Sequence, residues 1–326
     1  MFKKGLFTAV VVSIVALALL AGCGRGAKKE LTIGVSYASL DIQFFQFYQK
    51  GVNDEAQKLG VKVVEVDSFY DVEKQLSGIE TLLSQKVDAL IVHPVDESAV
   101  VPGVLAANKA GVPVFALDRP PTGGKLGCYL SAGHDVIGPM QGEFIATSLN
   151  GKGNVVLVQG PLGESYTRKL DAGIKSAFAK YPDIKILAEQ SAGGWDRAKA
   201  MAVMEDFLQK YGEKIDAVIA TADMIAMGTA QAIKARNLKK TILIVGADGD
   251  LDMLQGIKKG EIAGTIDPQP LESGRIALRT AVLLAQKKPI PDVKDVNGVP
   301  TLEVPILLVT KENVDQTPEW GTIPLE

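Results

Sequence analysis

Short apolar runs alternate with longer segments of helical periodicity along most of the chain. The runs 31–37, 61–66, 87–92, 112–117 and 154–160 are rich in Val, Ile and Leu, as strands buried on both faces are. Between them, apolar residues recur every three or four positions, for example at Phe44, Tyr48 and Val52. Strands separated by helices of this length predict βαβ units, parallel sheets and an α/β fold.

The second half of this pattern repeats the first. The segments that start at Val61 and at Ile184 both run strand, loop, helix and strand. Asp71 precedes the helix in the first segment and Asp196 precedes it in the second, where each is expected to cap the helix. Chance similarity between two βαβ segments is the alternative. A true repeat in 326 residues predicts two similar parallel-sheet domains with a cleft between them.

Charged and aromatic residues gather where the predicted strands end. Asp118 and Arg119 follow the run 112–117, and two prolines then stop the chain from continuing as a strand. Other residues just past a strand end are Phe44, Phe45, Arg168, Trp195, Asp223 and Asp248. Ligands of open α/β sheets bind outside the carboxyl ends of the strands, so we expect these side chains to face the cleft. A surface turn or a helix cap is the alternative for each of them, above all for Asp223.

These residue types favour one kind of ligand. Aspartates accept hydrogen bonds from hydroxyls, arginine donates through a rigid fork, and aromatic faces cover the apolar side of a sugar ring. Together they suit a small, neutral, polyhydroxylated molecule. Glycoside hydrolysis, which needs two positioned carboxylates, is an alternative, but no G-x-S-x-G elbow, P-loop or G-x-G-x-x-G fingerprint is present, and we expect no enzymatic activity.

The beginning of the chain has the features of an export signal. Lys3 and Lys4 precede the uncharged run 5–20, and the sequence LAGC follows and ends at Cys23. This sequence resembles the lipobox of bacterial lipoproteins, which implies a signal peptide over 1–22, a lipid on the sulfur of Cys23 and a tether over 23–30. A transmembrane anchor is the alternative. We therefore expect an exported protein, periplasmic or at the cell surface, held on a membrane by its lipid.

Composition and charge bear on whether the protein binds nucleic acid, a metal or a cofactor. The net charge is −3 and no long basic block is present, so we expect no nucleic-acid partner. Besides Cys23, Cys128 is the only cysteine, and it is expected to be a small buried residue. The two histidines, His93 and His134, form no cluster with metal-ligand spacing, so we expect neither a metal site nor a cofactor.

Six segments follow one another in the order of a known family. They are IGVSYASLDIQFFQFYQKGVNDEAQKLG, VPVFALDRPP, GWDRAKAMAVMEDFL, VIATADMIAMGTAQAI, ILIVGADGD and GTIDPQP. Over about residues 31 to 310 the chain resembles the type I periplasmic sugar-binding proteins, in particular the ribose-binding family. The resemblance implies a periplasmic-binding-protein type I fold, in which two similar parallel-sheet α/β domains are joined by a three-crossing hinge around a ligand cleft.

The resemblance also implies where the domains divide. The N-terminal domain would comprise 31–131 and about 268–300, and the C-terminal domain 132–267 and about 301–326. The chain would cross the hinge near residues 132, 267 and 300, and a last strand, 302–310, would return to the C-terminal domain.

Site roles follow from the same resemblance. Phe44 and Phe45 would lie on the ligand ring from one domain and Trp195 would cover it from the other, while Asp118, Arg119, Arg168 and Asp248 would hold its hydroxyls. Asp223 is a further candidate ligand-binding residue because it lies at a strand end. The chain departs from the family at several site positions. Ala222 replaces the usual asparagine, and Pro268 replaces the usual glutamine, for which Asp267 or Gln269 would substitute. Ile42 replaces a polar residue, for which Asp41 would substitute, and the usual hinge Ser-Asp-Asn becomes Ala132-Gly133-His134. We expect a ligand that binds more tightly than ribose.

The implied function is that of a monomeric extracytoplasmic solute-binding lipoprotein. Such a protein captures a small neutral sugar or polyol and delivers it to the permease subunits of an ABC importer. A receptor that serves a chemoreceptor or a quorum-signal importer is the alternative, since it shares the fold, the cleft and the localisation. A sugar-responsive repressor would need an N-terminal DNA-binding domain, which the export signal replaces.

Overall fold

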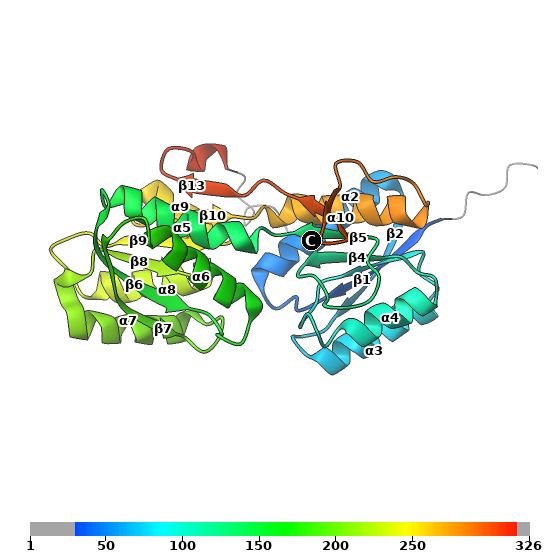
Figure 1. Ribbon diagram of the computed structural model, residues 1–326, viewed down its shortest axis with the longest axis horizontal. Helices are drawn as coiled ribbons and strands as arrows, with labels where there is room; N and C mark the ends of the chain where they lie inside the picture. The colour runs from blue at the N-terminus through cyan, green and yellow to red at the C-terminus, as the bar shows by residue number, and fades with distance from the viewer. Residues whose placement is uncertain (1–29, 318–326) are drawn as a thin grey trace, which may run out of the picture.

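A computed structural model describes residues 30–317 of the chain as two lobes that lie side by side (Figure 1). Each lobe is built on its own sheet, and we call the lobe that contains residue 32 the first domain and the other the second domain. The predicted signal peptide, Cys23 and most of the tether lie outside the described residues. Within those residues, no helix is long and apolar enough to cross a membrane.

The first domain contains a seven-stranded sheet in the order β11-β12-β5-β4-β3-β1-β2. Its strands are β1 (Thr32–Tyr37), β2 (Lys62–Asp67), β3 (Ala89–Val92), β4 (Val114–Asp118), β5 (Cys128–Ser131), β11 (Lys294–Val296) and β12 (Val299–Glu303). All neighbours are parallel except β11 and β12. Four helices cover it: α2 (Gln43–Leu59), α3 (Val72–Ser84), α4 (Val101–Lys109) and α10 (Pro270–Ala285).

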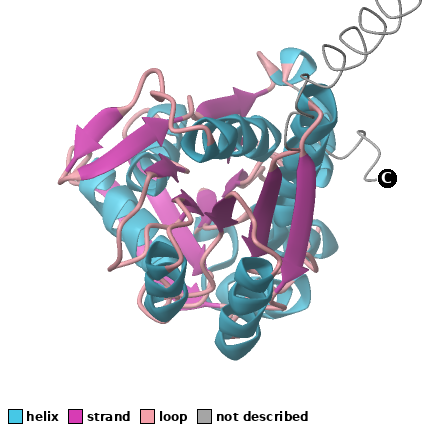
Figure 2. Cartoon of the chain, turned by 90° about the vertical axis from the view of Figure 1, so that its right-hand side faces the viewer, coloured by secondary structure: helices cyan, strands magenta, loops and turns pink. Residues whose placement is uncertain are grey.

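The second domain contains a six-stranded sheet in the order β13-β10-β9-β8-β6-β7. Its strands are β6 (Lys152–Gln159), β7 (Asp183–Ser191), β8 (Ala217–Ala220), β9 (Leu243–Ala247), β10 (Gly264–Asp267) and β13 (Leu307–Thr310), and only β13 is antiparallel. Its helices are α5 (His134–Ser148), α6 (Ser165–Phe178), α7 (Arg197–Tyr211), α8 (Asp223–Ala235) and α9 (Leu251–Lys259), with short 3-10 turns at Gly212–Lys214 and Val314–Gln316. Seen from the side of the first domain, helices surround most of the strands (Figure 2).

The predicted repeat is confirmed, because β2-β1-β3-β4-β5 and β7-β6-β8-β9-β10 have the same order. Asp71 and Asp196 both cap their helices, and each side chain accepts a hydrogen bond from a backbone N–H three residues on. Asp88 and Asp216, which directly precede β3 and β8, also have equivalent roles, since each carboxylate accepts an N–H near the start of a neighbouring strand, from Thr32 in β1 and from Asn154 in β6.

Buried apolar side chains hold each sheet between its helices, as the runs of Val and Ile predict. In the first domain, α2 and α10 pack backbone to backbone. A side chain at Gly51 would collide with the carbonyl of Leu271, and one at Gly274 would collide with that of Tyr48. Cys128 is buried in this core with a free thiol, as the sequence predicts.

Three segments connect the two sheets. They lie between β5 and α5, between β10 and α10, and between β12 and β13. The expected single strand over 302–310 is wrong, because the chain forms β12 in the first sheet and β13 in the second, with Val304–Ile306 crossing between them. The apolar residues of 302–310 suit one continuous strand, but Pro305 lies within this run, and proline cannot donate a hydrogen bond to a neighbouring strand. Strands β5 and β11, which are four and three residues long, were not predicted from the sequence.

Candidate functional site

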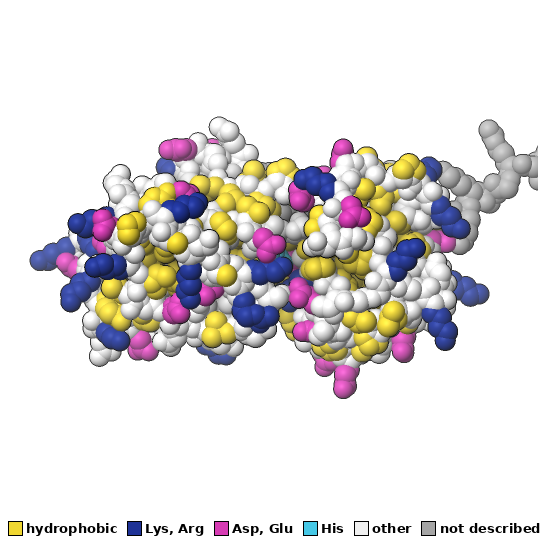
Figure 3. Space-filling view, in the orientation of Figure 1, with side chains coloured by type: hydrophobic (Ala, Val, Ile, Leu, Met, Phe, Trp, Pro, Cys, Tyr) yellow, Lys and Arg dark blue, Asp and Glu magenta, His cyan; other side chains and the backbone are white. Residues whose placement is uncertain are grey.

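A cavity of about 360 Å³ lies between the two domains, at the carboxyl ends of their strands. The loops after β1, β2 and β4 line it from the first domain, and those after β7, β8 and β9 line it from the second. Two of the connecting segments contribute as well, through Ala132, His134 and Pro268. The position of this cavity is the one predicted from the strand ends. Acidic and basic side chains are interspersed over both lobes on the face drawn in Figure 3.

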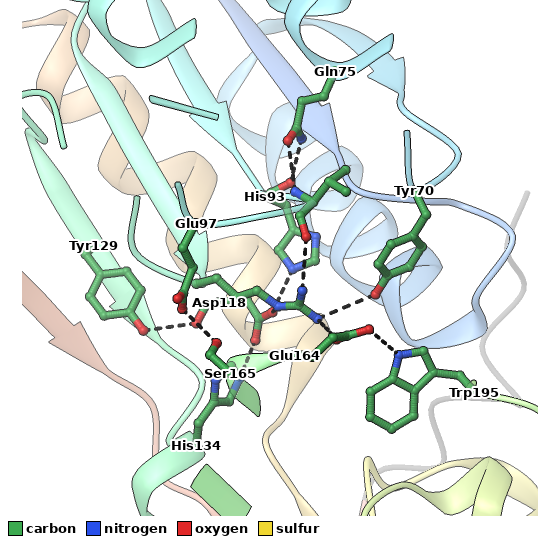
Figure 4. A network of polar contacts seen from close by, with 12 residues as sticks. Tyr70, Gln75, His93, Glu97, Asp118, Tyr129, His134, Glu164, Ser165 and Trp195 are labelled. Atoms are coloured by element: carbon green, nitrogen blue, oxygen red, sulfur yellow. Dashed lines mark hydrogen bonds and ion pairs between the residues drawn. The ribbon is translucent and has the colours of Figure 1, made fainter. Parts of the chain in front are cut away.

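Asp118 is the centre of the polar network in this cavity (Figure 4). It ends β4 with a left-handed backbone, φ 69°, and is only 4% exposed. His93, which follows β3, donates from Nε2 to Asp118 Oδ2 at 2.8 Å, and His134, the first residue of α5, donates from Nε2 to Oδ1 at 2.8 Å. The hydroxyl of Tyr129 donates to the Asp118 carbonyl at 2.9 Å, which helps to hold the unusual backbone. Both histidines of the chain therefore converge on one carboxylate.

This environment keeps Asp118 ionised. Burial by itself would raise the pKa of the Asp118 carboxyl, but the charge and hydrogen bonds of His134 and then His93 outweigh burial and hold its pKa well below the usual range. Burial lowers the pKa of the His93 imidazole, although the hydrogen bond and charge of Asp118 oppose this effect. Since an ionised carboxylate only accepts hydrogen bonds, each imidazole must carry a proton on Nε2. Asp118 is thus a fixed acceptor at the cavity wall.

Arg119 extends the network toward the second domain. Its Nε lies 3.5 Å from Asp118 Oδ2, and one terminal nitrogen donates to Glu164 Oε2 at 3.0 Å and contacts the hydroxyl of Tyr70. Burial would lower the pKa of Arg119, but Asp118, Tyr70 and Glu164 raise it, so that the guanidinium remains charged. The other oxygen of Glu164 accepts the indole N–H of Trp195 at 3.0 Å.

Aromatic rings form the remaining walls. Phe44 and Phe45 contact each other edge to face with centroids 5.5 Å apart, and Phe45 packs 4.5 Å from the ring of His93. On the opposite wall, Tyr166 stands edge-on to Trp195 at 5.7 Å and to His134 at 4.8 Å. Aromatic rings of both domains therefore line the cavity.

The second domain adds an acidic edge to the cavity. Asp248 directly follows β9 with φ 133° and, like Asp250 and Asp252, lines the cavity. Burial, and then the charge of Asp250, raise the pKa of Asp248 well above its usual range. Burial, followed by the charge of Asp252, raises the pKa of Asp250 to about 6. Arg197 pairs with Asp252 at 2.9 Å, so one guanidinium lies beside the carboxyl groups of this edge.

Six of the sequence-predicted site residues line the cavity together: Phe44, Phe45, Asp118, Arg119, Trp195 and Asp248. The positions at which the chain departs from the family, Ile42, Ala222 and Pro268, line it too. Whether these residues contact a ligand stays a prediction, which the experiments below test.

The structure places four other predicted residues away from the cavity wall, which corrects their expected positions. Asp41 is exposed, and its neighbour Ile42 lines the cavity instead. Arg168 is also exposed, on the second turn of α6, where it donates to the carbonyls of Leu162 and Gly163. One helical turn therefore separates it from Glu164, which faces the cavity network.

Asp223 and Gln269 serve the backbone of the site. Asp223 is fully buried, and its carboxylate accepts the N–H groups of Gly249 and Asp250, each at 2.8 Å, so that it shapes the loop that carries Asp248. Gln269 donates to the carbonyl of Pro305, which ties the second connecting segment to the third. Both residues position the cavity without lining it.

Sequence reasoning missed several residues of the site. Tyr70 and Tyr166 line the cavity, and His93 and Glu164 complete its polar network. His93 immediately follows the strand 87–92, so the strand-end argument applied to Asp118 would have found it. Among residues 30–317, no group of three or more His, Cys, Asp or Glu side chains is arranged to hold a metal ion.

Comparison with known proteins now identifies the class that this fold and site define. Residues 33–289 match the periplasmic binding protein domain family. The chain belongs to this family.

Among characterised relatives, the chain is 38% identical to a ribose import binding protein, RbsB, of Bacillus subtilis (strain 168), over 78% of this chain and 82% of that protein. It is 32% identical to a xylitol-binding protein of Mycolicibacterium smegmatis, over 91% of this chain and 83% of that protein.

Solved structures agree in fold. A solute-binding protein of Actinobacillus succinogenes with bound D-allose superposes with a TM-score of 0.81 and 27% identity, over 88% of this chain and all of that one. A solute-binding protein of Bacillus halodurans with bound myo-inositol superposes with a TM-score of 0.80 and 27% identity, over 90% of this chain and 98% of that one. The predicted type I periplasmic-binding-protein fold is thereby confirmed.

Proposed function

We propose that this protein captures a small neutral sugar or polyol in the cavity between its domains and delivers it to an ABC importer, without catalysing a reaction. The observation that carries the proposal is the pairing of Asp118 and Arg119 at the wall of a cavity whose two sides are aromatic. Named relatives bind ribose and xylitol, and similar structures contain allose and myo-inositol, which supports a ligand of this class.

The chemistry of the walls supports a neutral ligand. Asp118 and Glu164 share the positive charge of Arg119, and Arg197 pairs with Asp252, so no cation on the wall is left for an anionic ligand to neutralise. Hydroxyl groups both donate and accept, which matches a wall of carboxylates beside a guanidinium. A cavity of about 360 Å³ lies at the small end of the range for ligand sites, which suits a monosaccharide or a short polyol.

Calorimetric titration with ribose, xylose, D-allose, galactose, glucose, myo-inositol and xylitol tests the proposal. We expect at least one of them to bind with a micromolar dissociation constant, about −8 kcal/mol. Ribose should not bind tightest, because Ala222 and Pro268 supply no side-chain amide to its hydroxyls. If ribose binds tightest, the departures at Ala222 and Pro268 do not affect ligand choice. The proposed function would be contradicted if none of these sugars binds, or if one of them is converted into a product.

We further propose that the mature protein begins at Cys23 and is held on the membrane by a lipid on its sulfur. The apolar run before LAGC supports this, although Cys23 lies outside the described residues. Two acyl chains anchor a protein far more stably than one. Cys23→Ala should therefore move the protein from the membrane fraction to the soluble fraction or leave it uncleaved. Mass spectrometry of the native N-terminus is the direct measurement, and an unmodified Cys23 thiol would contradict the lipid anchor.

A further inference from the structure

The side chain of Glu164 connects the two domains instead of capping its own helix. Glu164 precedes α6 with an extended backbone, the usual place for a cap, yet its carboxylate makes no capping hydrogen bond. One oxygen accepts from Arg119 at 3.0 Å and the other accepts from the indole of Trp195 at 3.0 Å (Figure 4). A single carboxylate thereby joins a cation of the first domain to an aromatic ring of the second.

Trp195 is held from more than one side. Its ring lies directly over Gly160, where even a single added carbon atom would collide with it, and Tyr166 packs edge-on beside it. Gly160 and Tyr166 restrict where the ring lies, and the hydrogen bond to Glu164 fixes how its edge is turned. Glu164 therefore sets the orientation of the aromatic face that lines the cavity.

A second contact of the same helix end crosses between the domains. Ser165 donates from its hydroxyl to Glu97 Oε1 of the first domain at 3.0 Å. The side chains of Arg119 and Glu164 are 8% and 21% exposed, so their ion pair is shielded from water more than a surface pair is. None of these contacts involves a ligand. The contacts of Arg119 with Glu164 and of Glu97 with Ser165 can form only when the two domains are close together.

We propose that Glu164 is a positioning residue for ligand capture: by joining Arg119 to Trp195 it stabilises the closed arrangement of the domains in the absence of ligand and sets both groups in their places on the cavity wall. A binding site that is already populated in its competent form loses less affinity to the conformational change that binding requires. Loss of the link then raises the population of the open form.

Glu164→Gln is the sharpest variant, because it preserves the size of the side chain. Arg119 and Trp195 each donate to a different oxygen of Glu164. Glutamine has only one acceptor oxygen, and its NH2 group would face the other donor, so one of the two hydrogen bonds must be lost. Glu205→Gln, on the exposed side of α7, removes the same charge outside the cavity and serves as the matched control. Ser165→Ala removes only the contact with Glu97 and should have a smaller effect.

The test is small-angle scattering of the ligand-free proteins. Glu164→Gln should have a larger radius of gyration than both the wild type and Glu205→Gln, with Ser165→Ala in between. In a Trp320→Phe background, which leaves Trp195 as the only tryptophan, acrylamide should quench Glu164→Gln more strongly. An unchanged radius in Glu164→Gln, with folding verified by its thermal transition, overturns the proposal whatever the fluorescence shows.

The experiment is independent of the proposed function, because it needs no sugar. If a sugar of the titration panel binds, its dissociation rate from Glu164→Gln should rise roughly tenfold, as expected for loss of a charge-assisted hydrogen bond in the closed form. If none binds, the proposed function fails, while the scattering comparison still decides the role of Glu164.

Discussion

Replacing Asp118 with alanine should lower the affinity for the tightest sugar of the panel at least about 30-fold, which corresponds to about 2 kcal/mol of lost hydrogen bonding to a charged group. It should also lower the free energy of unfolding by about 3 kcal/mol, because a buried ionic network loses its central partner. The carboxylate holds His93, His134 and Arg119 at once, and Asp118 itself is almost fully buried. Calorimetry gives the affinity and denaturant titration gives the stability.

Asp88→Ala is the matched control, because Asp88 lies in the same sheet at the end of β3 away from the cavity and accepts the N–H of Thr32. It should reduce stability and leave the affinity for sugar unchanged. Undiminished affinity in Asp118→Ala would show that this carboxylate supports the cavity wall without contacting the ligand.

The stability difference between wild type and Asp118→Ala should depend on pH in one direction. The pKa of Asp118 is lower in the folded protein than in the unfolded chain, so its ionised form stabilises the fold at every pH above about 4. That contribution is lost as the pH falls further, through the pKa of the folded state. The difference should be full at pH 7 and should shrink below about pH 4. A difference that grows below that pH would contradict the low pKa.

Trp195→Ala should lower the affinity roughly 30-fold to several hundredfold, the usual range for removal of a tryptophan from the centre of a binding site. Trp195→Phe keeps an aromatic face but loses the indole N–H that donates to Glu164, and should lower affinity only about fivefold. We expect the affinity to fall from the wild type to Trp195→Phe and then to Trp195→Ala. The first step measures the contribution of the indole hydrogen bond, and the second measures that of the aromatic ring. Calorimetric titration of the three proteins measures it.

Tyr181→Ala is a suitable control for Trp195→Ala. Tyr181 is a half-buried aromatic residue of the same domain that precedes β7, at the edge of the sheet away from the cavity. Its loss should leave affinity unchanged. Equal affinities for Trp195→Ala and the wild type would mean that the ring closes the cavity without touching the ligand.

The sequence by itself determined the architecture, because its signals are local and repeated. Apolar runs of strand length alternate with helical periodicity, and Asp71 and Asp196 mark equivalent helix starts in the two halves. Parallel strands bring their carboxyl ends to one edge, so a residue just past a strand can be assigned to the cavity without a structure. This reasoning placed Asp118, Arg119 and Asp248 correctly at the cavity wall.

Only the tertiary structure decided which neighbours these residues have. His93 and His134 lie 25 and 16 residues from Asp118, and only the pairing of β3, β4 and β5 brings the three together. At the start of α6 the sequence offers Glu164 just before the helix and Arg168 one turn into it, and only the structure shows that Glu164 meets Arg119 of the first domain whereas Arg168 donates to the carbonyls of its own loop. Local pattern specifies that a helix forms and where it begins, whereas the face that it presents depends on contacts with residues distant in the sequence.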